Sequence, residues 1–352
     1  DFDLILEPGI ADQQGNTRVT GYTSRFTTAL GFSEFGHLLI ANEIGRSLSV
    51  FDLETYGESP MSPVDLGVAP IEMQYDAAQC LLYVLYDSWI GRCGILTIDV
   101  ITMAIVGDSG PVLPGDASDL ALCSEWSLVA ATSPDEDAVY TLATADLDVE
   151  RVRIINPPGS APGPVAWDGM RDHLVVGLAG SSRVTALVLP SLNTAAGFPV
   201  AAAPRLQAIR IDHAHRRAWV AGRLAYTIVD LVNPSRTQTF QMPQPCAPLP
   251  CDHVGLWDIE IDPVRDRVFM LDRRNAIMSV VLSTGMVAPE SPGFIGGWQQ
   301  DLVLNPRSGV LIVLELRNFA PHFGLVDAAT LMEVTGTAGI AGDGARRCLA
   351  IP

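Results

Sequence analysis

Lysine is missing from this sequence: all 22 basic residues are arginine, against 40 acidic residues, and the formal net charge is −18. A surface of this charge repels phosphate backbones, which argues against nucleic acid as a partner. No apolar run reaches the roughly 18 residues that a membrane helix needs, so we expect no membrane span. Because 48% of the residues are hydrophobic and only 18% are charged, wholesale disorder is excluded.

Several catalytic signatures are missing as well. The chain has no Gly-x-Ser-x-Gly, His-Glu-x-x-His, phosphate-binding loop or dinucleotide fingerprint, and no Cys-x-x-Cys pair. Serine hydrolases, zinc proteases, NTPases, dehydrogenases and c-type haem proteins therefore lose their usual sequence support.

Cysteine usage bears on the compartment. The six cysteines stand at positions 80, 93, 123, 246, 251 and 348. An even number in a chain that begins at Asp1 favours a processed protein in an extracellular, periplasmic or cell-surface location. Cys246 and Cys251 bracket Ala-Pro-Leu-Pro, which favours a local disulfide, and a Cys80–Cys123 bond is a second candidate. Buried free thiols are the alternative.

An internal repeat of about 45 residues is the strongest signal that is present. Each copy begins with the pattern apolar-x-apolar followed by a turn residue. The turn positions are Ser33, Asp76, Cys123, Asp168, Asp212, Asp262, Asn305 and Pro352.

Each copy then continues with three more strand-like runs. A strongly apolar run comes first, as in residues 81–86, then a run that often ends in Asp, as in 96–99, and then a weaker one, as in 150–155. Four short strands per repeat are typical of a β-propeller blade, whose inner strands are covered on both faces by neighbouring blades.

The number of blades follows less directly from the repeat. Seven complete sets and an eighth inner strand at the C-terminus favour eight blades, in which residues 1–25 close the ring with 340–352. Seven blades with both termini outside the ring is the alternative. In both cases we expect residues 1–352 to form a single all-β propeller domain.

The runs Leu82-Tyr-Val-Leu85 and Gly94-Ile-Leu-Thr-Ile-Asp99 resemble the bacterial YVTN-type repeats of surface-layer-like and lactonase-like propellers. The resemblance implies the propeller fold. It implies no activity, because that group contains enzymes, electron-transfer subunits and binding scaffolds.

Carboxylates recur at the start of the inner strands, four residues before the turn position, at Glu72, Asp119, Asp258 and Asp301. The positions one and three before the turn are apolar, so strand alternation places the acids on the opposite side, near the mouth of the central channel. In an eight-bladed ring Glu72 would face Asp258, and Asp119 would face Asp301.

Two interpretations of these acids remain open. Clustered carboxylates attract Ca²⁺, another divalent cation or a cationic ligand, and Trp257 and Trp298 could line the same mouth. Alternatively, each acid accepts hydrogen bonds from neighbouring backbone or arginine and orders the blades, with the tryptophans packed in the core.

Three weaker candidates are histidines and a turn. His213 and His215 could bind one metal ion, but the rest of a zinc set is missing. Asp252-His253 could form an acid–base pair, and the acidic turn 133–137 could bind Ca²⁺ weakly, although a solvated hairpin is the default.

Two functions follow from the sequence. The first is a secreted or cell-envelope scaffold that binds a protein or small ligand on one face of the ring. The alternative is a metal-dependent enzyme of the lactonase or lyase kind, with its site at the acidic channel mouth.

Overall fold

The computed structural model describes residues 2–6, 22–26, 36–88, 90–242, 255–272, 276–289, 293–294, 298–305, 307–317, 320–334, 339–340 and 345–351. The chain divides into two compact units, Asp1–Glu34 and Phe35–Pro352. Among the described residues, no helix has the length and apolar character needed to cross a membrane.

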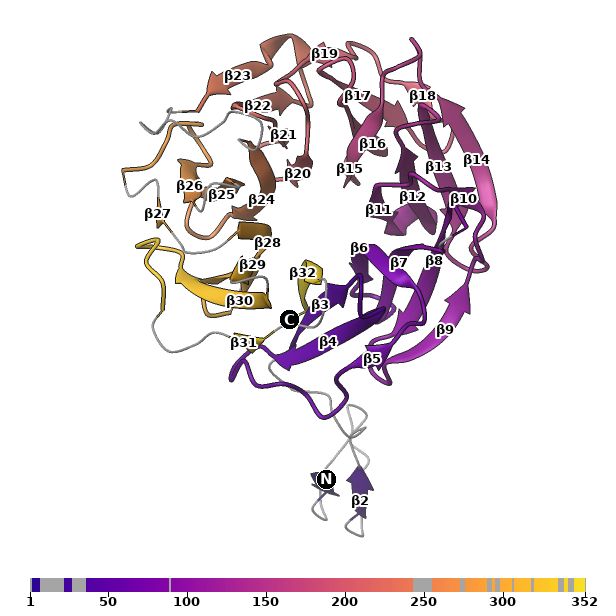
Figure 1. Cartoon of the computed structure of the whole chain (residues 1–352), viewed down its shortest axis with the longest axis vertical. Helices are drawn as coiled ribbons and strands as arrows, with labels where there is room; N and C mark the ends of the chain where they lie inside the picture. Colours follow the sequence, from indigo (N-terminus) through magenta and orange to yellow (C-terminus); the bar gives the residue numbers. More distant parts are fainter. Residues whose placement is uncertain are drawn as a thin grey trace, which may run out of the picture. The chain divides into compact units, whose positions relative to one another are not determined.

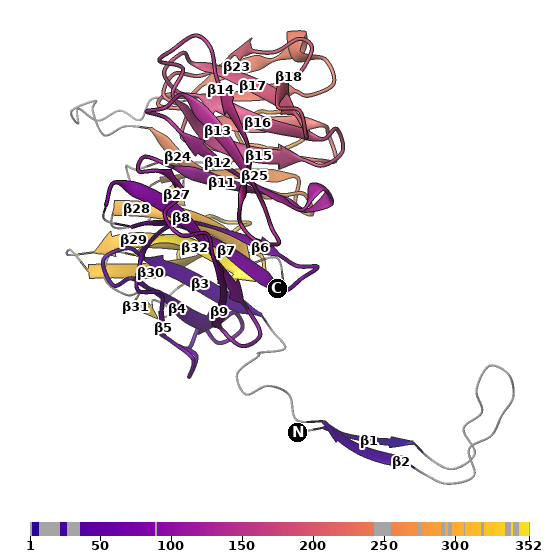
Figure 2. The same cartoon turned by 90° about the vertical axis from the view of Figure 1, so that its right-hand side faces the viewer.

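The first unit contains an antiparallel pair of strands, β1 (Phe2–Leu6) and β2 (Tyr22–Phe26), which Figure 2 shows side by side. Their register pairs Phe2 with Phe26 and Leu6 with Tyr22. Within the described part of the chain, β1 and β2 pair only with each other.

The second unit is a β-propeller of seven blades arranged around a central space, as Figure 1 shows. Each blade runs from an inner to an outer strand, and in blades 2 and 4 the outer strand is in two pieces. Blade 1 contains β32 (Ala345–Ile351), β3 (His37–Asn42), β4 (Ser47–Asp52) and β5 (Val64–Asp65). Blade 2 contains β6 (Ala69–Asp76), β7 (Leu81–Asp87), β8 (Arg92–Asp99), β9 (Ala104–Asp108) and β10 (Leu113–Pro114). Blade 3 contains β11 (Asp119–Cys123), β12 (Leu128–Ser133), β13 (Ala138–Ala143) and β14 (Val149–Ile154).

The remaining four blades follow in chain order. Blade 4 contains β15 (Pro162–Asp168), β16 (His173–Leu178), β17 (Arg183–Val188), β18 (Asn193–Thr194) and β19 (Val200–Ala201). Blade 5 contains β20 (Ala208–Asp212), β21 (Arg217–Ala221), β22 (Ala225–Asp230) and β23 (Gln238–Gln241). Blade 6 contains β24 (Leu256–Asp262), β25 (Arg267–Asp272), β26 (Ala276–Val281) and β27 (Gly293–Phe294). Blade 7 contains β28 (Trp298–Asn305), β29 (Val310–Arg317), β30 (Ala320–Asp327) and β31 (Gly339–Ile340). Two short 3₁₀ helices, η1 (Ser124–Trp126) and η2 (Pro234–Arg236), lie in connections.

The prediction of eight blades is wrong, and seven is the number observed. The C-terminal strand β32 pairs with β3 and so completes the first blade instead of starting another. A strand has only one edge on its inner side, so β3 accepts a single inner partner. The repeat motif at residues 30–33 therefore does not add an eighth blade. That motif lies outside the described residues. The pairing of β32 with β3 lies within the predicted closing segment 340–352, and the predicted part of residues 1–25 in the closure stays a prediction.

The buried second strands explain why the apolar runs are nearly continuous. Leu38, Leu39, Ile40 and Ala41 of β3 are all fully buried. Leu39 packs in the core between blades 1 and 2, whereas Leu38 packs with Phe323 between blades 7 and 1. Each such side chain contributes about 1.5–3 kcal/mol when it leaves water, so both faces of each strand hold the ring together.

The acidic turn residues of the repeat have a structural role. Asp52 accepts hydrogen bonds from the backbone N–H groups of Glu54 and Thr55 at 2.9 and 2.8 Å. Asp76 does the same for Ala78 and Gln79. Such side-chain-to-backbone bonds stabilise tight turns, which is why Asp recurs at these positions.

Four cysteines can be compared with the disulfide predictions. Cys80, Cys123 and Cys348 are free thiols, so the predicted Cys80–Cys123 bond is wrong. The thiols of Cys93, Cys123 and Cys348 are buried in the interior that the blades share. Cys246 and Cys251 lie outside the described residues.

Candidate functional site

The predicted acids occupy equivalent positions on the inner strands, which we call the hub ring. The register pairs Glu72 with Leu85 and Asp301 with Leu314, the fifth residue of the second strand in each blade. In blade 1 that position belongs to Arg347, which pairs with Ala41. Counting four residues back from the predicted turn position Pro352 gives Cys348, so the repeat pattern is wrong by one residue in this blade. The hub ring therefore consists of Arg347, Glu72, Asp119, Pro164, Ala208, Asp258 and Asp301.

Three of the hub acids tie their blade to the next one. Asp119 accepts the Val165 N–H of blade 4 at 2.7 Å, and Asp258 accepts the Leu302 N–H of blade 7 at 3.1 Å. Asp301 accepts the Cys348 N–H of blade 1 at 2.6 Å. These bonds match the interpretation in which the acids order the blades.

Arg347 contacts both Glu72, the fourth hub acid, and Asp301. Its Nε lies 2.8 Å from Glu72 Oε2, and its Nη1 donates to Asp301 Oδ1 at 3.1 Å. The guanidinium thus joins blade 1 to both of its neighbours, blades 2 and 7. An arginine fork suits this task because it can contact two carboxylates at once.

The seven-bladed ring changes the predicted geometry of the acids. An odd number of blades leaves no blade directly opposite another, so the expected pairing of Glu72 with Asp258 and of Asp119 with Asp301 is wrong. Among the described residues, no three His, Cys, Asp or Glu side chains are arranged to hold one metal ion. Trp257 is half-buried and does not line the channel cavity, and the side chain of Trp298 is outside the described part.

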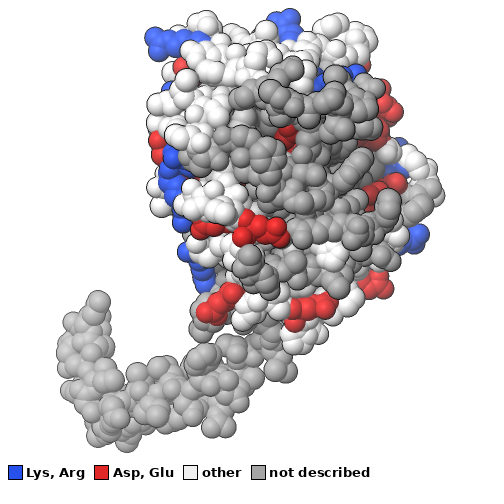
Figure 3. All heavy atoms as spheres, turned by 60° about the vertical axis from the view of Figure 1, so that its left-hand side comes forward, with Lys and Arg blue, Asp and Glu red and all other residues white. Residues whose placement is uncertain are grey.

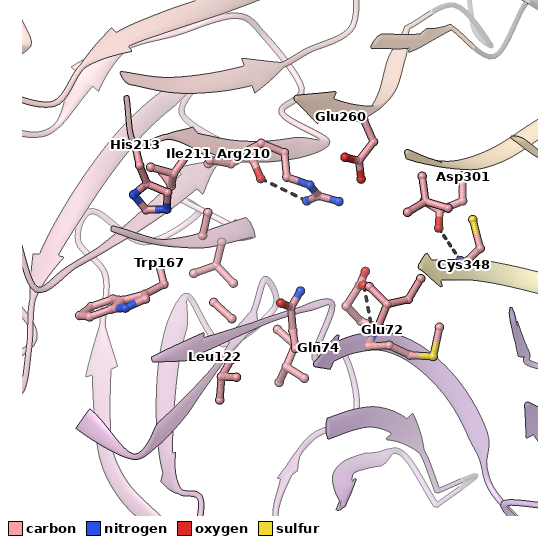
Figure 4. A pocket seen from close by; sticks show the side chains of 18 residues that line it. Glu72, Gln74, Leu122, Trp167, Arg210, Ile211, His213, Glu260, Asp301 and Cys348 are labelled. Atoms are coloured by element: carbon pink, nitrogen blue, oxygen red, sulfur yellow. Dashed lines mark hydrogen bonds between the residues drawn. The ribbon is translucent and has the colours of Figure 1, made fainter. Parts of the chain in front are cut away.

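A cavity of about 320 Å³ opens in the channel beside the hub ring. It is lined by the side chains two residues further along each inner strand, which we call the middle ring. These residues are Leu349, Gln74, Ala121, Ala166, Arg210, Glu260 and Val303. Figure 4 shows Arg210 and Glu260 pointing into the same space, with Gln74 across from them. The cavity is therefore polar on some blades and apolar on others.

Arg210 is held in place from the neighbouring blade. Its Nη2 donates to Asp258 Oδ1 at 3.3 Å, and its Nη1 donates to the Ile209 carbonyl at 3.2 Å. Its side chain remains 40% exposed in the channel. Although burial opposes it, the nearby carboxylates, Asp258 first and then Glu260, raise the pKa of Arg210 above its ordinary value. The guanidinium is therefore a permanent positive charge with unused N–H donors.

The carboxyl of Glu260 holds its proton near neutral pH. Burial and the negative charge of Asp258 raise its pKa to about 8, against the opposing effect of Arg210. Burial and the charge of Glu72 likewise raise the pKa of Asp119 to about 7. Burial and Asp258 raise the pKa of Asp301 as well. Because shifted pKa values concentrate at functional sites, Glu260 is the best acid–base candidate in the cavity.

The other end of the cavity contains Trp167 and His213. The Trp167 indole N–H donates to Glu125 Oε2 at 2.7 Å, and His213 Nδ1 lies 3.9 Å from Asp168 Oδ1. His215 points elsewhere, with its Nδ1 at 2.7 Å from Asp212 Oδ2. The two histidines predicted to share a metal ion thus have different carboxylate partners.

The remaining weak candidates are the acidic turn 133–137 and the Asp252–His253 pair. In the acidic turn, Asp137 accepts the N–H groups of Gly159 and Ala161 at 2.6 and 2.7 Å, so it secures the loop that leads into blade 4. Asp135 donates its backbone N–H to Asp116. Asp252 and His253 lie outside the described residues.

The surface charge is dispersed on the face that Figure 3 shows, where acidic side chains form several separate groups. The net charge of −18 is thus not gathered into a single patch on that face. The polar cavity in the channel remains the feature that marks a site.

No protein-family model and no curated protein matches this sequence. Three solved structures resemble it over 90%, 90% and 91% of this chain and 99% of each of theirs. They are a structural-genomics protein of Lactobacillus plantarum (TM-score 0.73, 13% identity), the periplasmic gluconolactonase of Pseudomonas aeruginosa (0.70, 13%) and a candidate 6-phosphogluconolactonase of Bacteroides fragilis (0.69, 12%).

The chain has the fold of the lactonase-like propellers. The predicted resemblance is confirmed at the level of the fold, and identities this low carry nothing about activity.

Sequence reasoning missed Arg347, Arg210 and Glu260. The misaligned last strand hid Arg347. Arg210 and Glu260 lie two residues beyond the hub ring on neighbouring inner strands, on the same channel-facing side. Extending the alternation argument by one more step along each strand would have found both.

Proposed function

We propose that the channel cavity binds and hydrolyses the lactone of a small hydroxylated acid. The observation that carries this proposal is the placement of Arg210 and Glu260 on adjacent inner strands, with both side chains in one cavity of about 320 Å³. That volume suits a small metabolite. A fixed cation beside a carboxyl group with a shifted pKa is suited to acyl chemistry.

The reaction assigns one role to each side chain. Water adds to the lactone carbonyl carbon while the Glu260 carboxylate takes its proton. Arg210, held by Asp258, stabilises the negative charge that develops on the carbonyl oxygen. The ring C–O bond then breaks, and the proton on Glu260 passes to the departing oxygen to give the hydroxy acid.

The choice of substrate class rests on three kinds of support. A lactone is uncharged, which suits a cavity where acids and arginines are already paired. Two similar folds belong to a gluconolactonase and a candidate 6-phosphogluconolactonase. The middle ring also offers the Gln74 amide for a substrate hydroxyl group.

Titration of acid release from δ-gluconolactone tests the proposal. The purified protein should accelerate hydrolysis above the uncatalysed rate, and the rate should rise with pH through about 8 as Glu260 loses its proton. Glu260→Gln should lower the rate about 10²–10⁴-fold. The control Glu150→Gln changes an exposed carboxylate on β14 and should leave the rate unchanged. Full activity in Glu260→Gln, or no acceleration with a series of hydroxy-acid lactones, would contradict the proposal.

The divalent cation predicted at Glu72, Asp119, Asp258 and Asp301 remains a prediction. Elemental analysis of the purified protein tests it. A stoichiometric cation such as Ca²⁺ would assign the stabilisation of the oxyanion to the metal as a Lewis acid rather than to Arg210.

A binding scaffold is the second candidate function. The outer strands β9 and β14 expose apolar side chains, among them Val106 at 58% and Ile154 at 51%. Exposed apolar residues on edge strands are typical of surfaces that bind another protein. Loss of a bound partner on Val106→Asp with Ile154→Asp, with lactone hydrolysis absent, would favour the scaffold.

We keep an extracellular, periplasmic or cell-surface location as part of the proposal. One similar structure is periplasmic, which supports it, and the predicted Cys246–Cys251 disulfide, outside the described residues, stays a prediction. Fractionation of cells that express the native gene tests the location.

A further inference from the structure

In blades 2, 5 and 6, both carboxylate oxygens of the aspartate in the turn after the inner strand are hydrogen-bonded. One oxygen accepts backbone N–H groups, and the other accepts the side chain three residues later. These second contacts are Gln79 Nε2 to Asp76 Oδ2 at 3.0 Å, His215 Nδ1 to Asp212 Oδ2 at 2.7 Å, and Arg265 Nη1 to Asp262 Oδ2 at 2.7 Å.

Asp168 in blade 4 departs from this rule. Its Oδ1 accepts the Met170 N–H at 3.2 Å, but its Oδ2 is buried and has no hydrogen-bond partner among the residues that the structure describes. The residue three positions later, Arg171, donates instead to the Leu231 carbonyl of blade 5 at 2.6 Å. Asp168 is only 1% exposed, so its carboxylate is shielded from bulk solvent. A buried acceptor without a partner is costly, and such exceptions in a native fold require an explanation.

Two histidines are neighbours of Asp168, and one of them, His213, lines the channel cavity. His213 Nδ1 lies 3.9 Å from Asp168 Oδ1, and the His213 side chain is 55% exposed and lines the channel cavity. A distance of 3.9 Å is too long for a hydrogen bond, although contacts of this kind tighten when a ligand binds. Trp167 lines the cavity beside His213, as Figure 4 shows, and is fixed by Glu125.

We infer that Asp168 and His213 form a ligand-binding dyad at the end of the cavity remote from Arg347. Asp168 accepts the His213 Nδ1–H, which leaves Nε2 as an acceptor for a hydroxyl group of a small polyhydroxylated acid or its lactone. Trp167 supplies the flat wall against which the carbon chain of the ligand lies. The choice of ligand rests on the proposed function, whereas the dyad itself rests on the approach of His213 Nδ1 to Asp168 Oδ1, the oxygen that also accepts the Met170 N–H.

A second histidine competes for the same carboxylate. His173 stands opposite Asp168 in the register of β15 and β16, and its Nδ1 is also buried without a partner. His173 does not line the cavity, so a ligand there can reach His213 but not His173. An experiment must therefore report on the two rings separately.

Nitrogen-15 NMR of the histidine side chains tests the dyad without any assay of activity. Spectra of His213→Ala and His173→Ala assign the two rings. In the wild-type protein, at a pH where the ring is neutral, we expect His213 to be protonated at Nδ1. Asp168→Asn should move the proton to Nε2. Asn is tolerated at this turn, because Asn305 stands there in blade 7.

The matched control is Asp76→Asn, the same change at the same turn of blade 2, which should leave the His213 tautomer unchanged. An identical His213 tautomer in the wild type and Asp168→Asn, or a change at His173 alone, would overturn the dyad.

Calorimetry with δ-gluconolactone's stable product, D-gluconate, tests the binding role. His213→Ala should weaken gluconate binding about tenfold, the effect of losing one hydrogen bond. Unchanged affinity would overturn the binding role. If hydrolysis is absent while the tautomer still depends on Asp168, the proposed function fails and the dyad stands.

Discussion

Buried carboxylates have different hydrogen-bond partners at the two ends of the channel. At the hub ring, Asp119, Asp258 and Asp301 each accept a backbone N–H from the next blade, and Arg347 joins Glu72 to Asp301. At the opposite end, Asp168 keeps one oxygen without a partner beside a half-exposed His213. The hub acids therefore order the blades, whereas Asp168 departs from the pairing of three other described turn aspartates and is the position that we infer to bind a ligand.

The largest effect should come from breaking the arginine contact at the hub ring. Arg347→Ala leaves the buried Asp301 and the nearby Glu72 without their cation, and we expect a loss of about 3–5 kcal/mol in the free energy of unfolding. Urea denaturation followed by tryptophan fluorescence measures it. Arg347→Met keeps most of the volume and separates the loss of charge from the loss of packing. A loss below 1 kcal/mol in both variants would show that blade 1 closes without the ion pairs.

The fold could be predicted from the sequence to the level of the blade, and the reason is physical. The hydrogen-bonding and burial demands of a blade repeat in every copy, so turn residues such as Asp76 and buried runs such as 81–86 are visible in the sequence. Ring closure depends on which strand occupies the inner edge of β3, and residues 30–33 and 349–352 both have the required pattern. Only the tertiary pairing decides between them.

The site was less predictable for the same reason. The hub acids were found because they recur, whereas Arg210 and Glu260 each occur in one blade only. His213 was considered as half of a metal pair, because its true neighbour Asp168 stands in another blade, 45 positions away in the sequence. A repeat pattern does not show which residues of different blades are in contact, and the candidate site is built from such contacts.

A smaller effect concerns pH. The pKa of Glu260 is raised from its ordinary 4.5 to about 8, so the folded protein holds a proton that the unfolded chain releases. The contribution of Glu260 to stability is therefore full below about pH 4.5 and is lost as the pH rises to about 8. Glu260→Gln cannot ionise, so its stability relative to the wild type should increase between pH 5 and pH 9. Urea denaturation at a series of pH values measures this difference. With Glu150→Gln as the control, a difference that is constant across the range would contradict the prediction.

The smallest expected effect compares the aspartate turn of blade 4 with that of blade 2. In Asp168→Asn, the buried side chain has no formal negative charge, which lowers the cost of burying its unpaired oxygen, so we expect stability to rise by about 1 kcal/mol. In Asp76→Asn, the same change removes the acceptor of Gln79 and should lower stability by about the same amount. Thermal unfolding of the two variants at one pH compares them directly. A gain of stability in Asp168→Asn together with a loss in Asp76→Asn would mean that the unpaired oxygen of Asp168 lowers the stability of blade 4. We would then conclude that blade 4 is less stable at this position because Asp168 serves binding. Equal destabilisation in both blades would instead make Asp168 an ordinary turn residue.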